Sequence, residues 1–163
     1  MKAVLTIAHN ESLFLPIWYN YYKKYFNDED IYILDHDSND GSTDLSCNIV
    51  KVYNDKTYDH DWLLNTVQDF QEKLLKDYEI VAFAEADEII LHKNGLDKFL
   101  DEFRKSKAEA VRCTGYDLLH IPKEPDFNLN KDVLRQRKYW YYNGGEVKVL
   151  ISKTPIKWRH GQS

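Results

Sequence analysis

The chain has 163 residues, of which 30% are charged and 14% aromatic, and its formal net charge is −5. This length favours a single domain with a core of its own, and the negative charge argues against nucleic acid as a partner. The sequence lacks a run of about 18 apolar residues, so no membrane span is expected.

Strand-like and helix-like segments alternate along most of the chain. The strand-like segments are residues 2–8, 30–35, 48–54, 79–84 and 108–116. The segments with helical periodicity are residues 15–26, 61–78 and 95–106. After residue 116 the pattern weakens to two hairpin-like pieces, 138–143 and 146–153, which Gly144 and Gly145 divide. The alternation predicts one α/β domain over residues 1–163, with a mostly parallel sheet flanked by helices and a short mixed C-terminal hairpin region.

The two cysteines and the N-terminus bear on the compartment. Cys47 and Cys113 show no metal-binding spacing and are expected to be reduced thiols. The N-terminus has too few apolar residues for a signal peptide. We therefore expect a cytoplasmic protein.

Three predicted strands end in polar segments: "AHNE" at 8–11, "DHDSNDGS" at 35–42 and "EADE" at 85–88. The carboxyl ends of parallel strands open onto one edge of a sheet, where ligands bind. The "EADE" segment follows a near-continuous apolar run, so its carboxylates need a partner. Mg²⁺ or Mn²⁺ with a diphosphate would supply one. The alternative is that these acids cap turns and face water.

Two other interpretations of residues 34–44 compete. An EF-hand loop starting at Asp35 would need glycine at its sixth position and glutamate at its twelfth, where Asp40 and Ser46 stand, so it is rejected. The D-x-D of Asp35 and Asp37 resembles the first motif of the haloacid dehalogenase phosphohydrolases, in which one aspartate attacks phosphorus. That motif usually lies on the first strand, whereas here it follows the second. The phosphohydrolase interpretation stays open as an alternative.

The three segments together resemble the GT-A glycosyltransferases, specifically the family 2-like group. In that group the first strand ends in Tyr-Asn-Glu or a similar tripeptide, the second in "VDDGSTDGT", and the fourth in D-x-D or D-x-D-E. Here they are "AHNES", "LDHDSNDGST" and "AEADEII", and "HNESLFLPIWYNYYKKYF" is similar to the opening of one subgroup. The resemblance implies a GT-A fold and a metal-dependent transfer of a sugar from a nucleotide-diphosphate sugar, with UDP-sugars favoured, to an unknown glycan or small-molecule acceptor.

The resemblance also implies roles for residues at the donor. His9 would lie against the base, Asp35 would approach the base or ribose, and His36 stands where the family often has a base-reading aspartate. Glu85 would contact the ribose or reach the metal. The donor-binding set is completed by Ala8, Glu11 and Ala86.

The metal ion would be Mn²⁺ or Mg²⁺. Asp87 would bind it directly, with Glu85 and His160 as further contacts, and Lys148 would face phosphate. The ion would neutralise the diphosphate and help it leave. His160 as a plain surface histidine and Lys148 as a solvated strand lysine are the alternatives.

The acceptor side is expected in residues 116–163, beside a nucleotide-sugar-binding half formed by residues 1–115. An inverting enzyme needs a carboxylate to take the acceptor proton, and Asp117 is the candidate. Tyr116, Trp140 and Tyr141 could stack on an acceptor sugar, although such aromatic residues are more often core. A catalytically silent nucleotide-sugar-binding module is a further alternative.

Overall fold

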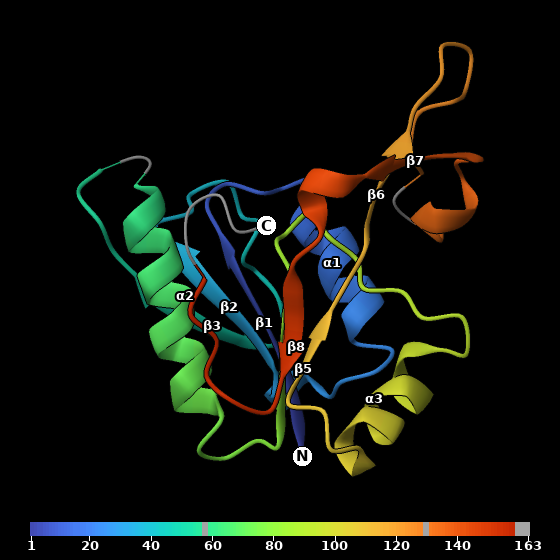
Figure 1. The fold of residues 1–163 in the computed structure, drawn as a ribbon. Coiled ribbons are helices and arrows are strands. Elements are labelled where there is room, and N and C mark those ends of the chain that lie inside the picture. Colours follow the sequence, from blue (N-terminus) through green and yellow to red (C-terminus); the bar gives the residue numbers. More distant parts are fainter. Residues whose placement is uncertain (57–58, 129–130, 159–163) are drawn as a thin grey trace.

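The computed structural model describes residues 1–56, 59–128 and 131–158 (Figure 1). A six-stranded sheet forms its centre, with the strand order β3-β2-β1-β4-β8-β5. Its strands are β1 (Lys2–Ala8), β2 (Ile31–His36), β3 (Asn48–Val52), β4 (Ile80–Phe83), β5 (Ala110–Arg112) and β8 (Val149–Ser152). Pairing is parallel from β3 through β4, and β8 runs antiparallel to both β4 and β5. The predicted α/β fold with a mostly parallel sheet is confirmed.

Helices cover both faces of the sheet (Figure 1). They are α1 (Phe14–Tyr22), α2 (His60–Leu74) and α3 (Leu96–Lys105). Short 3-10 turns lie at η1 (Asp28–Asp30), η2 (Val133–Arg135) and η3 (Gly144–Glu146). Helices α1 and α3 contribute to one hydrophobic cluster and α2 to the other. The two clusters follow from the alternation of side chains along a strand, since Val4 joins the first cluster while Ala3 and Leu5 join the second.

The helices have local causes in the sequence. Helix α2 begins at an N-cap, where the Asp59 carboxylate accepts a hydrogen bond from the backbone N–H of Trp62 at 3.1 Å. It buries Val67 and Leu74, which lie seven residues apart on one face. Helix α1 buries Trp18 and Tyr22 in the same way, at a spacing of four.

The C-terminal region differs from the prediction. An antiparallel hairpin is present, but it pairs β6 (Gly115–Leu119) with β7 (Tyr139–Asn143) instead of joining residues 138–143 to 146–153. Residues 149–152 enter the central sheet as β8. The predicted strand 108–116 is divided between β5 and β6, and a register shift at Val111 and Arg112 precedes the division. Local sequence did not reveal these partners because pairing depends on residues far apart in the chain.

The β6–β7 ribbon projects from the body of the molecule, at the top of the view in Figure 1. Within the described ranges, none of the helices combines the length and apolar character needed to cross a lipid bilayer.

Strand order locates the ligand crevice of such a sheet. From β1 the chain adds β2 and then β3 on one side, and β4 on the other. Open α/β sheets bind ligands outside the carboxyl ends of the strands at such a reversal. The crevice therefore lies between the end of β1 and the end of β4, where "HNE" and "EADE" follow the strands.

Candidate functional site

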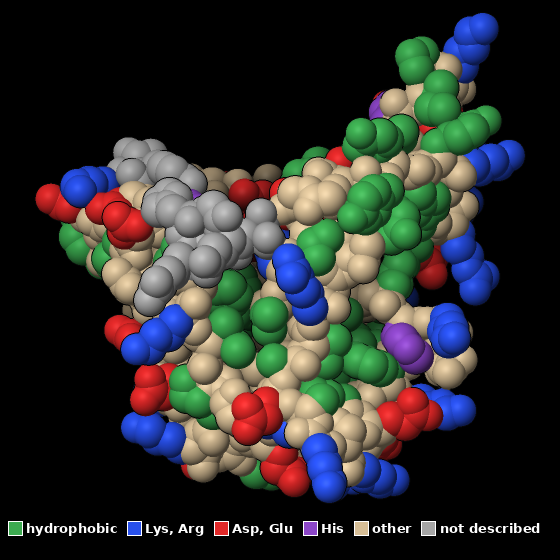
Figure 2. Space-filling model, viewed as in Figure 1, with side chains coloured by type: hydrophobic (Ala, Val, Ile, Leu, Met, Phe, Trp, Pro, Cys, Tyr) green, Lys and Arg blue, Asp and Glu red, His purple; other side chains and the backbone are tan. Residues whose placement is uncertain are grey.

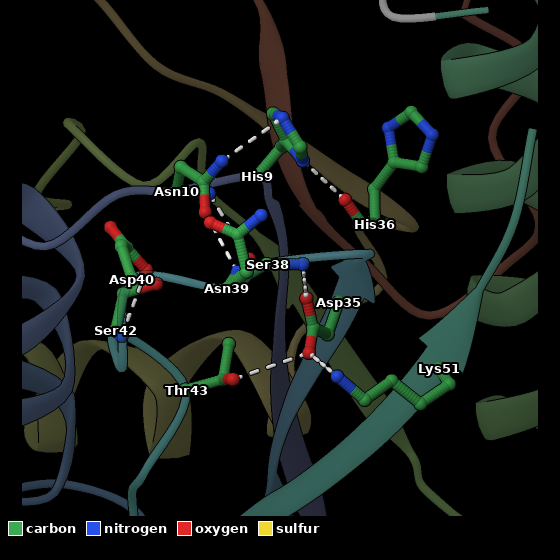
Figure 3. Close-up of polar contacts among 10 residues, drawn as sticks. All are labelled: His9, Asn10, Asp35, His36, Ser38, Asn39, Asp40, Ser42, Thr43 and Lys51. Atoms are coloured by element: carbon green, nitrogen blue, oxygen red, sulfur yellow. Dashed lines mark hydrogen bonds and ion pairs between the residues drawn. The ribbon is translucent and has the colours of Figure 1, made fainter.

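The loops after β1 and β2 are fastened to each other (Figure 3). The backbone N–H of Asn10 donates to Ser38 Oγ at 3.0 Å, and the N–H of Asn39 donates to Asn10 Oδ1 at 2.9 Å. The N–H of Ser12 donates to Asp40 Oδ2 at 3.1 Å. These bonds make one rim from two segments that lie 28 or 29 residues apart in sequence.

Left-handed backbone explains part of the unusual composition of this rim. Asn10, Asp37 and Gly41 have φ values of 56°, 55° and 78°. Glycine adopts this region without strain, and asparagine and aspartate tolerate it better than other residues. Much of the turn chemistry in "DHDSNDGSTD" thus serves the fold of the loop.

Asp35 braces the second loop from inside. Its side chain is 0% exposed, with Oδ1 accepting from the backbone N–H of Ser38 at 2.8 Å and Oδ2 accepting from Thr43 Oγ1 at 3.2 Å and from Lys51 Nζ (Figure 3). Burial raises the pKa of Asp35, but the hydrogen bonds from Lys51 and Ser38 outweigh it and hold the pKa below its ordinary value. Its contact with a base or ribose stays a prediction.

Two histidines stand side by side at the ends of β1 and β2. The His36 ring is buried at 6% exposure, 5.4 Å from the His9 ring and 4.7 Å from the Trp62 ring between centroids. His9 is exposed, and its Nδ1 hydrogen-bonds the carbonyl oxygen of His36 (Figure 3). His9 is thus placed to meet a planar ligand, while His36 packs behind it.

Glu11 and Asp87 flank the crevice between β1 and β4. Burial raises the pKa of Glu11, the negative charges of Asp87 and Asp40 raise it further, and His9 lowers it. Glu11 and Asp87 are therefore close enough to repel each other. Among the described residues, the Asp87 side chain has no hydrogen-bond or ion-pair partner. A positively charged ligand would relieve this repulsion.

Lys148 lies among three glutamates at the same edge. Its Nζ is 3.1 Å from Glu85 Oε1, 2.7 Å from Glu88 Oε1 and 3.2 Å from Glu146 Oε2. The second Glu88 oxygen accepts from the backbone N–H of Glu85 at 3.1 Å, so both oxygens of Glu88 are engaged. Lys148, which is predicted to face phosphate, pairs with carboxylates in this structure.

Asp117 lies on the β6–β7 ribbon, where Asn143 Nδ2 donates to Asp117 Oδ2 at 3.2 Å. Residues two apart on a strand share a face, so Asp117 shares one with Gly115. A Cβ on Gly115 would lie only 2.3 Å from Glu146 Cβ. The Asp117 face of the ribbon is therefore turned toward Glu146 at its root.

The ribbon carries most of the large exposed apolar side chains of the C-terminal region (Figure 2). These are Tyr116, Leu119, Tyr139, Trp140, Tyr141 and Tyr142, each at least 40% exposed. Pairing places Tyr116, Tyr142 and Trp140 on one face and Asp117, Tyr141 and Tyr139 on the other. The aromatic residues of the prediction are thus not core, and they divide between two faces.

The residues suit a metal ion that is shared with a ligand. Over residues 1–56, 59–128 and 131–158, no three His, Cys, Asp or Glu side chains are arranged to hold a metal. Mg²⁺ in proteins is commonly bound by one or two carboxylates together with substrate phosphates and water. Asp87, with Glu11 beside it, meets that requirement, whereas Glu85 is already engaged by Lys148.

Some residues that are predicted to bind the donor or the metal are not exposed at this edge or are not described. Ala8 and Ala86 are buried at 4% and 9% exposure. His160 lies outside the described residues. Two further residues of the site carry no local signal in the sequence. Glu146 comes near Glu85 only through β8, and Lys51 pairs with Asp35 from the neighbouring strand.

Comparison with known proteins adds little to this geometry. No family model and no curated protein matches the chain. Among solved structures, the mannosyltransferase PcManGT from Pyrobaculum calidifontis, in complex with GDP-Man and Mn²⁺, is similar at 18% identity and a TM-score of 0.46. The similarity covers 69% of this chain and 34% of that protein, about a third of its length. A likeness at this level assigns neither activity nor ligand.

Proposed function

We propose that the protein is a metal-dependent glycosyltransferase that uses a nucleotide-diphosphate sugar, with UDP-sugars favoured. The observation that carries this proposal is the open pair of acids, Glu11 and Asp87, on either side of the crevice between β1 and β4. An uncompensated acidic pair at a strand-order reversal suits a divalent ion and a diphosphate. The motif resemblance at these strand ends supports the same proposal.

The rim formed by the first two loops supplies the nucleotide side. The exposed ring of His9 would lie against the base, with His36 packed behind it. Asp35 would act on the base or ribose indirectly, by holding the loop that meets them, and Glu11 would lie by the donor. Because these loops are already bonded together, little ordering would be needed on binding.

Asp87 would hold the metal ion, together with Glu11 and oxygens of the diphosphate. A bound Mn²⁺ or Mg²⁺ supplies Lewis-acid neutralisation of the leaving diphosphate. Because these acids repel each other, the diphosphate should bind weakly without metal.

The acceptor would lie between the donor and the ribbon, in the 116–163 half. In an inverting reaction the acceptor hydroxyl oxygen attacks the anomeric carbon, the bond from that carbon to the diphosphate breaks, and Asp117 takes the hydroxyl proton. Asn143 holds one Asp117 oxygen and leaves the other for this proton. Tyr141 shares the Asp117 face and offers a ring to an acceptor glycan or small molecule.

We predict that Tyr141→Ala raises the acceptor KM by about two- to twelvefold, because aromatic stacking contributes about 0.5–1.5 kcal/mol. Donor affinity should not change. The control is Trp140→Ala, which removes a similarly exposed ring from the opposite face. Steady-state kinetics with varied acceptor measure both. An equal effect of the two variants would contradict the assignment of this face.

Calorimetric titration tests the proposed function as a whole. UDP, GDP, CMP and their common sugar conjugates would each be titrated into the protein with Mn²⁺ and, separately, with a chelator. Metal-dependent binding of one nucleotide is expected and would identify the base. Equal affinity in chelator would refute the metal role, and failure of every nucleotide to bind would refute the proposal.

A further inference from the structure

Lys148 has an unusual excess of acids around one ammonium. Three carboxylate oxygens, from Glu85, Glu88 and Glu146, lie within 3.2 Å of its Nζ, which is part of a side chain only 13% exposed. The three carboxylates and one ammonium carry a net charge of about −2 when all are ionised. One carboxylate would be enough to tie β8 to β4. The three glutamates therefore form a cradle, meaning a set of carboxylates arranged to bind a cation, and the ammonium of Lys148 occupies it.

The pairing of β4 with β8 brings Lys148 and Glu85 together. Antiparallel pairing sets Ala82 opposite Ile151, and continuing this register by three residues sets Glu85 opposite Lys148. The Lys148 carbonyl oxygen accepts from the Cys113 backbone N–H at 2.8 Å. The backbone at Lys148 is thus held by the segment after β5, and the ammonium cannot leave the cradle without losing three ionic contacts.

Occupancy and charge both make this filled cradle a poor metal site. The ammonium nitrogen lies 2.7–3.2 Å from the three carboxylate oxygens and so takes the position that a metal ion would need. A divalent ion would also meet the charge of Lys148 at close range. By contrast, Glu11 and Asp87 have no cation at this distance within the described ranges.

We propose that the Lys148 ammonium permanently occupies the cradle and thereby determines which carboxylates of this edge can bind a metal ion. Its charge keeps a divalent metal ion from binding to Glu85, Glu88 and Glu146. Glu11 and Asp87, which have no such partner among the described residues, stay able to bind one. The proposal deepens the proposed function and rests on it for its role in donor binding. Glu85 is then an ion-pair partner of Lys148 and not a metal ligand.

Metal titration of the nucleotide-free protein tests this proposal. Mn²⁺ binding, followed by the paramagnetic resonance signal of free Mn²⁺, should be weak in the wild type and about tenfold or more tighter in Lys148→Met, because three acids lose their cation. Lys153→Met is the matched control, since Lys153 follows the other end of β8 and its Nζ bonds the Ser106 carbonyl. It should bind Mn²⁺ as the wild type does. Adding Glu88→Gln to Lys148→Met should reduce the gain, because one of the three carboxylates is then neutral.

Several results would overturn the proposal. These are equal affinities in wild type and Lys148→Met, an equal gain in Lys153→Met, or a gain that Glu88→Gln leaves undiminished. Circular dichroism establishes folding. If Lys148→Met does not fold, Glu85→Gln decides: unchanged Mn²⁺ affinity is expected, and loss of affinity would make Glu85 a metal ligand. Because no nucleotide is present, failure here is distinguishable from failure of the proposed function.

Discussion

Asp87→Asn should abolish metal-dependent donor binding and lower kcat/KM for transfer by about 100-fold or more, since loss of a metal contact at the diphosphate costs several kcal/mol. Asp87 is exposed and is the one acid of "EADE" placed beside Glu11 with its carboxylate open. Asparagine keeps the size of the side chain and removes its charge, so the metal loses a ligand while the fold should survive. Calorimetric donor titration and initial rates, each in Mn²⁺ and in chelator, measure the effect.

The matched control is Asp69→Asn, which removes the same charge from an exposed position on α2. It should leave both donor affinity and rate unchanged. If Asp87→Asn bound the donor as tightly as the wild type and kept its response to Mn²⁺, Asp87 would not be the metal ligand. Donor binding that is tight and metal-dependent in the wild type, but without transfer to any acceptor, would favour the silent binding module.

Asp35→Asn should lower the free energy of unfolding by about 2 to 3 kcal/mol, because it breaks a buried, hydrogen-bonded charge. The amide would present hydrogens either to the Ser38 N–H or to Thr43 and Lys51, all of which now donate to the carboxylate. The estimate allows for Lys51, whose side chain is 68% exposed and whose ion pair is therefore partly screened. Denaturant unfolding followed by circular dichroism measures the change.

The contribution of Asp35 should depend on pH in a definite direction. Its folded pKa lies below the ordinary value of 3.8, so its stabilisation is complete above that value and is lost as pH falls through the lower folded pKa. The difference between wild type and Asp35→Asn should thus be constant near neutral pH and shrink in strong acid. Asp37→Asn is the control: this residue is exposed in the same loop, at a φ of 55° that asparagine tolerates. Equal stability losses in the two variants would contradict the bracing role.

The same variants separate the transferase from the phosphohydrolase. A nucleophile must contact phosphorus, yet Asp35 is 0% exposed and both of its oxygens already accept hydrogen bonds. Burial therefore argues against the phosphohydrolase. That alternative requires Asp35→Asn to lose all activity while Asp87→Asn still binds nucleotide. The transferase requires that Asp87→Asn lose its metal-dependent binding.

Element types were readable from the sequence, because each depends on neighbours along the chain. The predicted helix 95–106 corresponds to α3 at Leu96–Lys105, and the predicted strand 2–8 is β1. Helix ends were less readable: the helices predicted at 15–26 and 61–78 end at Tyr22 and Leu74. There the chain closes with tighter turns, such as the bond from Tyr25 N–H to the Tyr22 carbonyl, which residue type alone does not specify.

The candidate site, too, was predictable from the sequence in part. The sequence indicated that "AHNE", "DHDSNDGS" and "EADE" would meet, and the bonds between the first two loops and the coupling of Glu11 to Asp87 place them together. It did not reveal which acids would be open. Asp35 and Asp87 look alike as strand-end carboxylates, but one is enclosed by Lys51, Ser38 and Thr43 and the other is exposed.

By itself the sequence determined the α/β alternation, the parallel core of the sheet and the polar strand ends at one edge, because periodicity and turn chemistry are local properties. Tertiary structure alone decided that β8 inserts beside β4, that Lys148 thereby fills a cradle of three glutamates, and that Glu11 and Asp87 remain open. The physical reason is that charge compensation acts through space. A lysine more than 60 residues from Glu85 in sequence is its neighbour only once the sheet has formed.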